Sequence, residues 1–162
     1  MIFKKICLIF CILFFVSSIS AEEMKNTILH YFDDADVLIM AAAVADYKPK
    51  VVSDEKIKKK DAELSLELVK TDDILKEIIK NKKQQFVVGF ALETNNEQEN
   101  AKQKLVQKNL DAIVLNCLND SGAGFGHDTN KVTIITTSEE KTYPLKSKKE
   151  VAVDILNFIE GC

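Results

Sequence analysis

The sequence contains no tryptophan, and its 162 residues include only two histidines, five glycines and two prolines. Collagen-like and low-complexity chains need far more glycine or proline, so both classes are excluded. The four cysteines, Cys7, Cys11, Cys117 and Cys162, form no C-x-x-C pair. With so few histidines beside them, they argue against a zinc site and against a fold built on disulfides.

No charge of one sign dominates either, because 22 Lys and Arg residues are balanced by 25 Asp and Glu residues, for a formal net charge of −3. This balance disfavours a globally basic nucleic-acid binder, so no nucleic-acid partner is expected. Hydrophobic residues make up 46% of the chain and charged residues 29%. This mixture and the length predict one globular domain.

The N-terminal segment differs from the rest of the chain. Lys4 and Lys5 precede an unbroken apolar run over residues 6–16 and then small residues up to Ala21. This order is typical of a secretory signal peptide, and the run is too short to predict stable membrane insertion. A buried first strand gives the same pattern. Both interpretations stay open for residues 1–20, ahead of a domain over residues 21–162.

Strand and helix patterns alternate along that domain. Continuous apolar runs predict buried strands at 37–43, 86–91 and 112–115. The alternating leucines Leu64, Leu66 and Leu68 predict a half-buried strand. Residues 132–135 and 142–145 predict a hairpin near the C-terminus.

Helix signals lie between these strands. The capping boxes Ser20–Glu23 and Ser147–Glu150 each predict a helix start. Thr71 is the expected cap of a helix whose first turn holds Asp72 and Asp73, and residues 96–108 form a polar helix. The alternation predicts an α/β fold with a mainly parallel sheet covered on both faces, followed by a C-terminal hairpin plus helix.

Candidate binding residues follow the buried strands, where ligands of parallel sheets bind. Small alanines and Asp46 follow the first strand, Phe90 lies near the end of the second, and Asn116 and Cys117 end the third. Lysines at 56–60 and 102–108 add positive charge, and the set suits a phosphorylated ligand that carries a base. The alternative is structural: alanines in close packing, Phe90 in the core and lysines on a solvated surface.

Five motifs that occur in a fixed order along the chain identify a family more specifically than any one of them alone. Residues 41–47 (AAAVADY), 56–59 (KIKK) and 86–94 (FVVGFALET), continued by 108–111 (KNLD) and 124–130 (GFGHDTN), resemble phosphopantothenoylcysteine synthetase. This family is the phosphopantothenate–cysteine ligase of coenzyme A biosynthesis, often the C-terminal half of a bifunctional bacterial flavoprotein. The resemblance runs from about Val16 to the C-terminus. It implies a Rossmann-like three-layer sandwich.

The resemblance also implies an activity and its partners. The ligase joins 4'-phosphopantothenate to cysteine through an acyl-cytidylate formed from CTP, with Mg²⁺ offsetting the triphosphate charge. A cytoplasmic homodimer is expected, with an exported or anchored protein as the alternative if residues 1–20 act as a signal peptide.

Site residues are implied position by position. Lys56 is the catalytic candidate, on a flap that reaches the phosphates, and no protein ligand to a metal is expected. The nucleotide-binding set is Ala42, Ala43, Asp46, Lys56, Asp72, Asp73, Ile74, Leu75, Phe90, Lys104 and Lys108.

Three departures from the family pattern are visible. The family's glycine- and serine-rich S-N-x-S-S-G loop has no counterpart, Cys117 stands where the family tends to have Asp, and Asp72 where it more often has Pro. The loop's absence predicts a truncated ligase that binds nucleotide with impaired or absent turnover. The alternatives are a non-catalytic nucleotide-binding remnant, a subunit that needs a partner chain, or an exported α/β domain with another role.

Overall fold

The structure is a computed structural model that describes residues 6–7, 20–53, 55, 57, 64–117 and 126–162. Its central sheet has the strand order β1-β2-β5-β6-β8-β9. The strands are β1 (Ile6–Cys7), β2 (Val37–Met40), β5 (Phe86–Glu93), β6 (Ala112–Cys117), β8 (Val132–Ile135) and β9 (Glu140–Thr142). The first four run parallel, whereas β8 and β9 form an antiparallel hairpin at one edge. The predicted sheet is confirmed.

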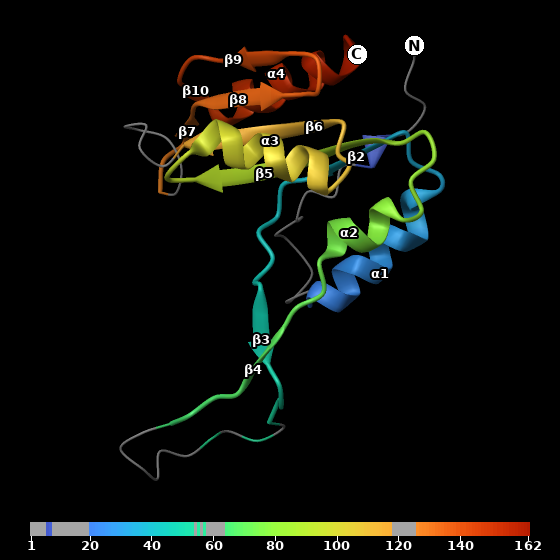
Figure 1. Ribbon diagram of the computed structural model, residues 1–162, viewed down its shortest axis with the longest axis vertical. Coiled ribbons are helices and arrows are strands. Elements are labelled where there is room, and N and C mark those ends of the chain that lie inside the picture. Colours follow the sequence, from blue (N-terminus) through green and yellow to red (C-terminus); the bar gives the residue numbers. More distant parts are fainter. Residues whose placement is uncertain (1–5, 8–19, 54, 56, 58–63, 118–125) are drawn as a thin grey trace.

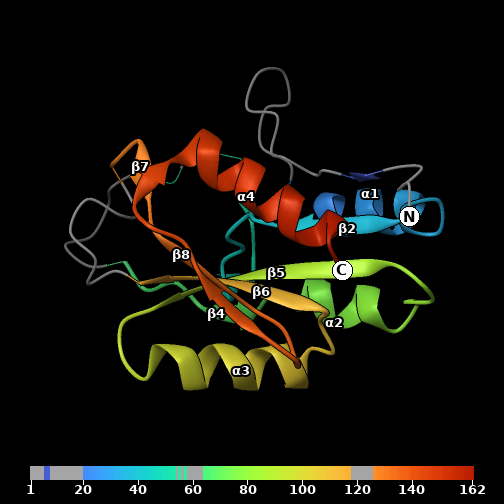
Figure 2. The ribbon, with the colours of Figure 1, turned by 90° about the horizontal axis from the view of Figure 1, so that it is seen from above.

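Helices cover both faces of this sheet, as Figure 2 shows. One apolar core packs α1 (Ala21–Phe32), α2 (Ile74–Ile79) and α3 (Glu97–Gln107) on one face. A second core packs α4 (Lys148–Glu160) on the other. Side chains alternate along each strand, so that in β6 Ile113 and Leu115 join the first core and Ala112 and Val114 the second. The three-layer α/β sandwich is confirmed.

Both predicted capping boxes are present. The Ser20 hydroxyl accepts from the Glu23 amide at 3.2 Å, and the Ser147 hydroxyl accepts from the Glu150 amide at 3.3 Å. At the N-terminal end, Ile6 pairs in parallel with Val37, as a first strand does. Apart from Ile6 and Cys7, residues 1–19 lie outside the described part, so the signal peptide stays a prediction.

Two strand predictions need correction. Strand β2 ends at Met40 rather than at residue 43, since its pairing with β5 stops at Gly89. The half-buried strand over Leu64–Leu68 is wrong: strand β4 is Leu68–Lys70, and Leu64 and Leu66 are 68% and 57% exposed. Strand β4 pairs with β3 (Tyr47–Pro49) in a two-stranded ribbon that projects away from the sheet (Figure 1), and no layer formed by the described residues covers it.

The start of α2 and the C-terminal hairpin also differ from prediction. Asp73, not Thr71, caps α2, because its Oδ1 accepts from the Lys76 amide at 3.2 Å, whereas the Thr71 amide donates to the Asp46 carbonyl at 2.8 Å. The second hairpin strand is β9, which ends at Thr142 rather than running to residue 145. A short antiparallel pair, β7 (Thr129–Asn130) with β10 (Lys146–Ser147), precedes α4 and was not predicted.

Among the described residues, no helix combines the length and apolar character that crossing a bilayer requires.

Candidate functional site

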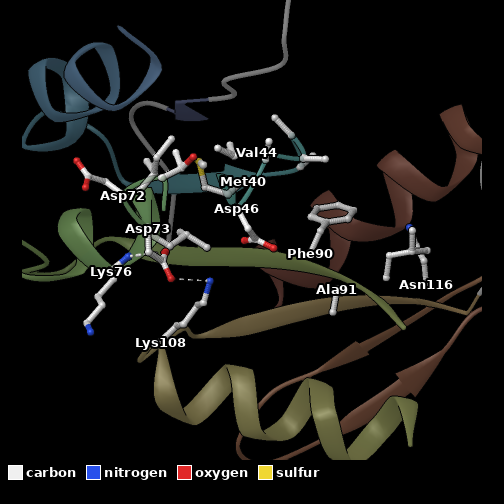
Figure 3. A pocket seen from close by; sticks show the side chains of 18 of the residues that line it. Met40, Val44, Asp46, Asp72, Asp73, Lys76, Phe90, Ala91, Lys108 and Asn116 are labelled. Carbon is white, nitrogen blue, oxygen red and sulfur yellow. Dashed lines mark hydrogen bonds and ion pairs between the residues drawn. The ribbon is translucent and has the colours of Figure 1, made fainter. Parts of the chain in front are cut away.

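A cavity of about 900 Å³ lies at the carboxyl edge of the parallel strands (Figure 3). The loop after β2, the start of α2 and the ends of β5 and β6 contribute most of its wall. Its lining residues are Met40, Ala41, Ala42, Ala43, Val44, Ala45, Asp46, Lys70, Thr71, Asp72, Asp73, Ile74, Leu75, Lys76, Phe90, Ala91, Leu92, Lys108, Asn116, Asn130 and Lys148. The volume and the position are those of a small-molecule site in an α/β fold.

The wall of the cavity next to β2 has small side chains that allow a ligand to approach the backbone closely. Residues 41–45 carry only methyl or isopropyl side chains, so a ligand can come near the backbone. Phe90 contributes an aromatic ring from β5, anchored on the α4 side of the core. Asp46 follows the alanines, and its carboxylate forms no hydrogen bond or ion pair with another described residue. An aromatic surface and an unpaired carboxylate are therefore both available to a ligand.

Ion pairs organise the wall at the start of α2. The Lys108 ammonium lies 3.1 Å from Asp73, and the Lys25 ammonium 2.9 Å from Asp72. Burial alone would raise the pKa of Asp73, but the hydrogen bonds from Lys108 and from the Lys76 amide outweigh it and hold that pKa below its ordinary value. The hydrogen bond from Lys25 lowers the pKa of Asp72. Both carboxyls are thus anionic at neutral pH.

Most of the expected site residues come together here. Ala42, Ala43, Asp46, Asp72, Asp73, Ile74, Leu75, Phe90 and Lys108 all line the cavity. Lys104 lies outside the lining, and its ammonium pairs with Glu93. Lys56 lies outside the described residues, as does all of the glycine-rich segment before Gly126.

Sequence reasoning did not select four polar residues of the lining, namely Lys70, Lys76, Asn130 and Lys148. Lys148 directly follows the cap of the last predicted helix. The sequence therefore places Lys148 at a helix start, but it does not show that this helix start lies at the cavity. The ammonium groups of Lys70, Lys76 and Lys148 form no ion pair with a described residue. They favour an anionic ligand. Within the described ranges, no group of three or more His, Cys, Asp or Glu side chains could hold a metal ion.

The comparisons with known proteins agree with this architecture. Residues 13–162 match the family model described as the DNA/pantothenate metabolism flavoprotein C-terminal domain. A protein named cysteine/cysteine sulfinic acid decarboxylase, from an unknown prokaryotic organism, is 51% identical over 142 residues, which are 86% of this chain and 40% of that protein. The coenzyme A biosynthesis bifunctional protein CoaBC of Bacillus subtilis (strain 168) is 46% identical over 146 residues, 90% of this chain and 36% of that protein.

Solved structures give the same picture. The crystal structure of the C-terminal domain of a CoaBC protein superposes with a TM-score of 0.70 at 40% identity, over 90% of this chain and 65% of that one. A DNA/pantothenate metabolism flavoprotein from Streptococcus pneumoniae has a TM-score of 0.71 at 20% identity, over 89% of this chain and 71% of that one, and shows the fold alone. The chain spans well under half of the two full-length relatives above.

Proposed function

The chain belongs to the family of the DNA/pantothenate metabolism flavoprotein C-terminal domain, and we propose that it acts as a phosphopantothenate–cysteine ligase domain in coenzyme A biosynthesis. The observation that carries the proposal is the cavity: nine residues implied by the ligase resemblance line one pocket at the strand ends. The 46% identity to a coenzyme A biosynthesis protein supports the same reading.

The proposed reaction has two steps. A carboxylate oxygen of 4'-phosphopantothenate attacks the α-phosphorus of CTP, and the bond to the β-phosphate oxygen breaks to release pyrophosphate. The cysteine nitrogen then attacks the acyl carbon of the acyl-cytidylate, so that CMP leaves, an amide forms and the ammonium protons are released to solvent. Neither step changes an oxidation state, so no oxidant or reductant is needed.

The chain's own residues bind and orient the nucleotide in this proposal. The alanines at 42 and 43 admit the nucleotide against the backbone, and Phe90 packs on it. Lys108 and Lys76 offer positive charge to the phosphates. Lys56 is proposed to reach the same phosphates. Fixed cations of this kind stabilise charge that develops as pyrophosphate departs.

Magnesium fits this donor set as an ion held mainly by the nucleotide. Proteins usually bind Mg²⁺ through one or two carboxylates together with substrate phosphates. Asp46 is the lining carboxylate without a partner among the described residues, so we propose, in departure from the sequence prediction of no protein ligand to a metal, that it would hold the ion. When bound, the ion would supply charge neutralisation for the triphosphate.

The projecting ribbon supports a proposed homodimer. Its described residues, 47–53 and 64–70, which we call the ribbon arm, expose large apolar side chains that no other described element covers. Exposed apolar side chains gathered on one element mark an interaction surface. A second copy of this chain is the proposed occupant.

A cytoplasmic location is proposed from the metabolism, because the substrates are cytosolic, and from the lack of a disulfide pattern in the sequence. Cell fractionation that finds a shortened, exported product beginning near Ala21 would contradict it.

The function is tested with the purified chain, Mg²⁺, CTP and 4'-phosphopantothenate. In line with the impaired turnover predicted from the missing S-N-x-S-S-G motif, we expect CTP to bind and pyrophosphate release to be slow and to require the acid substrate, with phosphopantothenoylcysteine formed after cysteine is added. The control omits phosphopantothenate. CTP binding without pyrophosphate release would contradict the ligase proposal and leave a nucleotide-binding domain.

A further inference from the structure

The cavity continues onto the α4 face of the sheet, where the proposed nucleotide contacts leave several polar groups without a role. Side chains alternate along β6, so Asn116 lies on the same face as Val114, which packs in the α4 core. Phe90 of β5 belongs to that face too. In Figure 3 Asn116 and Phe90 lie at one end of the cavity, away from Asp73 and its partner Lys108.

An amide pair fixes the polar groups at this end. The Asn130 Nδ2 donates to the Asn116 Oδ1 at 3.2 Å, and the Asn130 Oδ1 accepts from the Lys131 amide at 3.0 Å. Asn130 is only 9% exposed, so both its amide atoms are engaged in a buried setting. The Asn116 oxygen accepts from Asn130, which orients the amide and leaves its Nδ2 as the donor that Asn116 offers to a ligand.

A lysine that lines the same cavity follows strand β10. Strand β7 pairs with β10, which places Ser147 opposite Thr129, and the Lys148 amide donates to the Asp128 carbonyl at 2.9 Å. The nearby Lys146 is neutralised by Asp154 at 2.7 Å. Lys148 lines the cavity, and its ammonium forms no ion pair with a described residue.

We propose that Asn116, Asn130 and Lys148 form the subsite for the acid substrate, in which the Asn116 amide and the Lys148 ammonium bind one of its oxyanions. An amide donor held by a buried partner, together with an unpaired ammonium, is a recognition set for carboxylate or phosphate. The identity of the acid rests on the proposed function. The nucleotide occupies the α2 and α3 end of the same cavity.

The extent of the cavity, not its volume, provides for two occupants. Its volume of about 900 Å³ lies within the range of sites for a single small ligand, roughly 300–1,000 Å³. The cavity extends around the sheet edge from one face to the other, so two substrates can approach the strand ends from opposite sides. That arrangement would bring a bound carboxylate toward the nucleotide phosphates.

The test is calorimetric titration of the full chain with 4'-phosphopantothenate and, separately, with CTP. We compare Lys148→Met and Asn116→Asp with Lys149→Met, which removes the same charge from an exposed neighbour outside the cavity lining. Loss of one charge-assisted contact should weaken acid binding by roughly 10-fold in Lys148→Met and Asn116→Asp. The CTP affinity should stay within about 2-fold, and Lys149→Met should change neither.

Titration with pantothenate, which lacks the phosphate, identifies the bound oxyanion. A Lys148→Met effect that persists assigns the contact to the carboxylate, and one that disappears assigns it to the phosphate. The proposal is overturned if Lys148→Met and Lys149→Met weaken acid binding equally, if only CTP binding falls, or if the unmodified chain binds no acid. Absence of CTP binding by the unmodified chain contradicts the proposed function instead, and the acid titration still decides the subsite.

Discussion

Lys104 and Lys108 lie one helical turn apart, yet the structure gives them different surroundings. Lys108 lines the cavity beside Asp73, whereas Lys104 pairs with Glu93 outside the lining. We therefore expect Lys108→Met to weaken CTP binding by roughly 10-fold and Lys104→Met by less than about 2-fold, measured by calorimetry. Equal losses in the two variants would contradict this difference and place both ammonium groups on the phosphates.

Asp73 predicts a dependence of stability on pH. Its pKa is lower in the folded chain than its ordinary value, so the unfolded chain takes up the proton first as pH falls. The stability it contributes is complete above the ordinary pKa, about 4, and is lost as pH falls through the lower folded value. Asp73→Asn keeps the cap acceptor and removes the titration. The difference in unfolding free energy between wild type and Asp73→Asn should therefore shrink below about pH 4 in urea titrations.

Asp73→Ala separates the cap from the charge. This variant also removes the side-chain oxygen that accepts the cap hydrogen bond. It should therefore lower the unfolding free energy by about 1 kcal/mol even at a pH at which the Asp73 carboxyl is protonated. A wild type and an Asp73→Asn variant whose difference stays constant with pH would contradict a depressed Asp73 pKa.

Cavity residues next to the ends of the buried strands could be predicted from the sequence, whereas cavity residues that other elements contribute could not. Asp46 and Phe90 line the cavity because each lies at or just beyond a strand that an apolar run revealed. Lys148 and Asn130 reach it through the β7 and β10 pair, whose strands of two residues each carry no periodic pattern. Thr71 and Asp73 are both good caps, and the backbone hydrogen bond from Thr71 to Asp46, not the residue type, decides between them.

Among the elements, the buried strands were predictable because burial on both faces forces an unbroken apolar run, and two helix starts because each carries a capping box. The exceptions have one cause, the absence of a neighbour. Strand β2 ends where its pairing with β5 ends, and the leucine alternation before β4 packs against no layer in the described part of the chain. A periodic pattern indicates that a segment can form a half-buried strand, but its apolar side chains become buried only where another element packs against them.

The ribbon arm carries a prediction of its own. We expect the chain to sediment as a dimer at micromolar concentration, and Leu66→Glu to raise the dimer dissociation constant by at least about 10-fold, since a charge would enter an apolar interface. Val106→Glu is the matched control, because Val106 on α3 is also exposed, at 71%. A monomeric wild type, or an equal effect of both variants, would contradict self-association through the arm.

For the whole molecule, the sheet and the ribbon arm should differ in local stability. Strands β5 and β6 are each paired on both sides and covered on both faces, while β3 and β4, among the described strands, pair only with each other. Amide hydrogen exchange followed by mass spectrometry should therefore be slowest in β5 and β6 and fastest in β3 and β4. Ribbon amides that exchange as slowly as those of β5 would contradict this order.

The hydrogen bond between the Thr71 amide and the Asp46 carbonyl joins the two chain segments at the base of the ribbon arm. Both residues also line the cavity, so a ligand in the cavity and a partner on the arm would act on the same short piece of backbone. Thermodynamic linkage makes any such influence mutual: if CTP tightens self-association by some factor, self-association tightens CTP binding by that same factor. The apparent affinity for CTP would then depend on protein concentration.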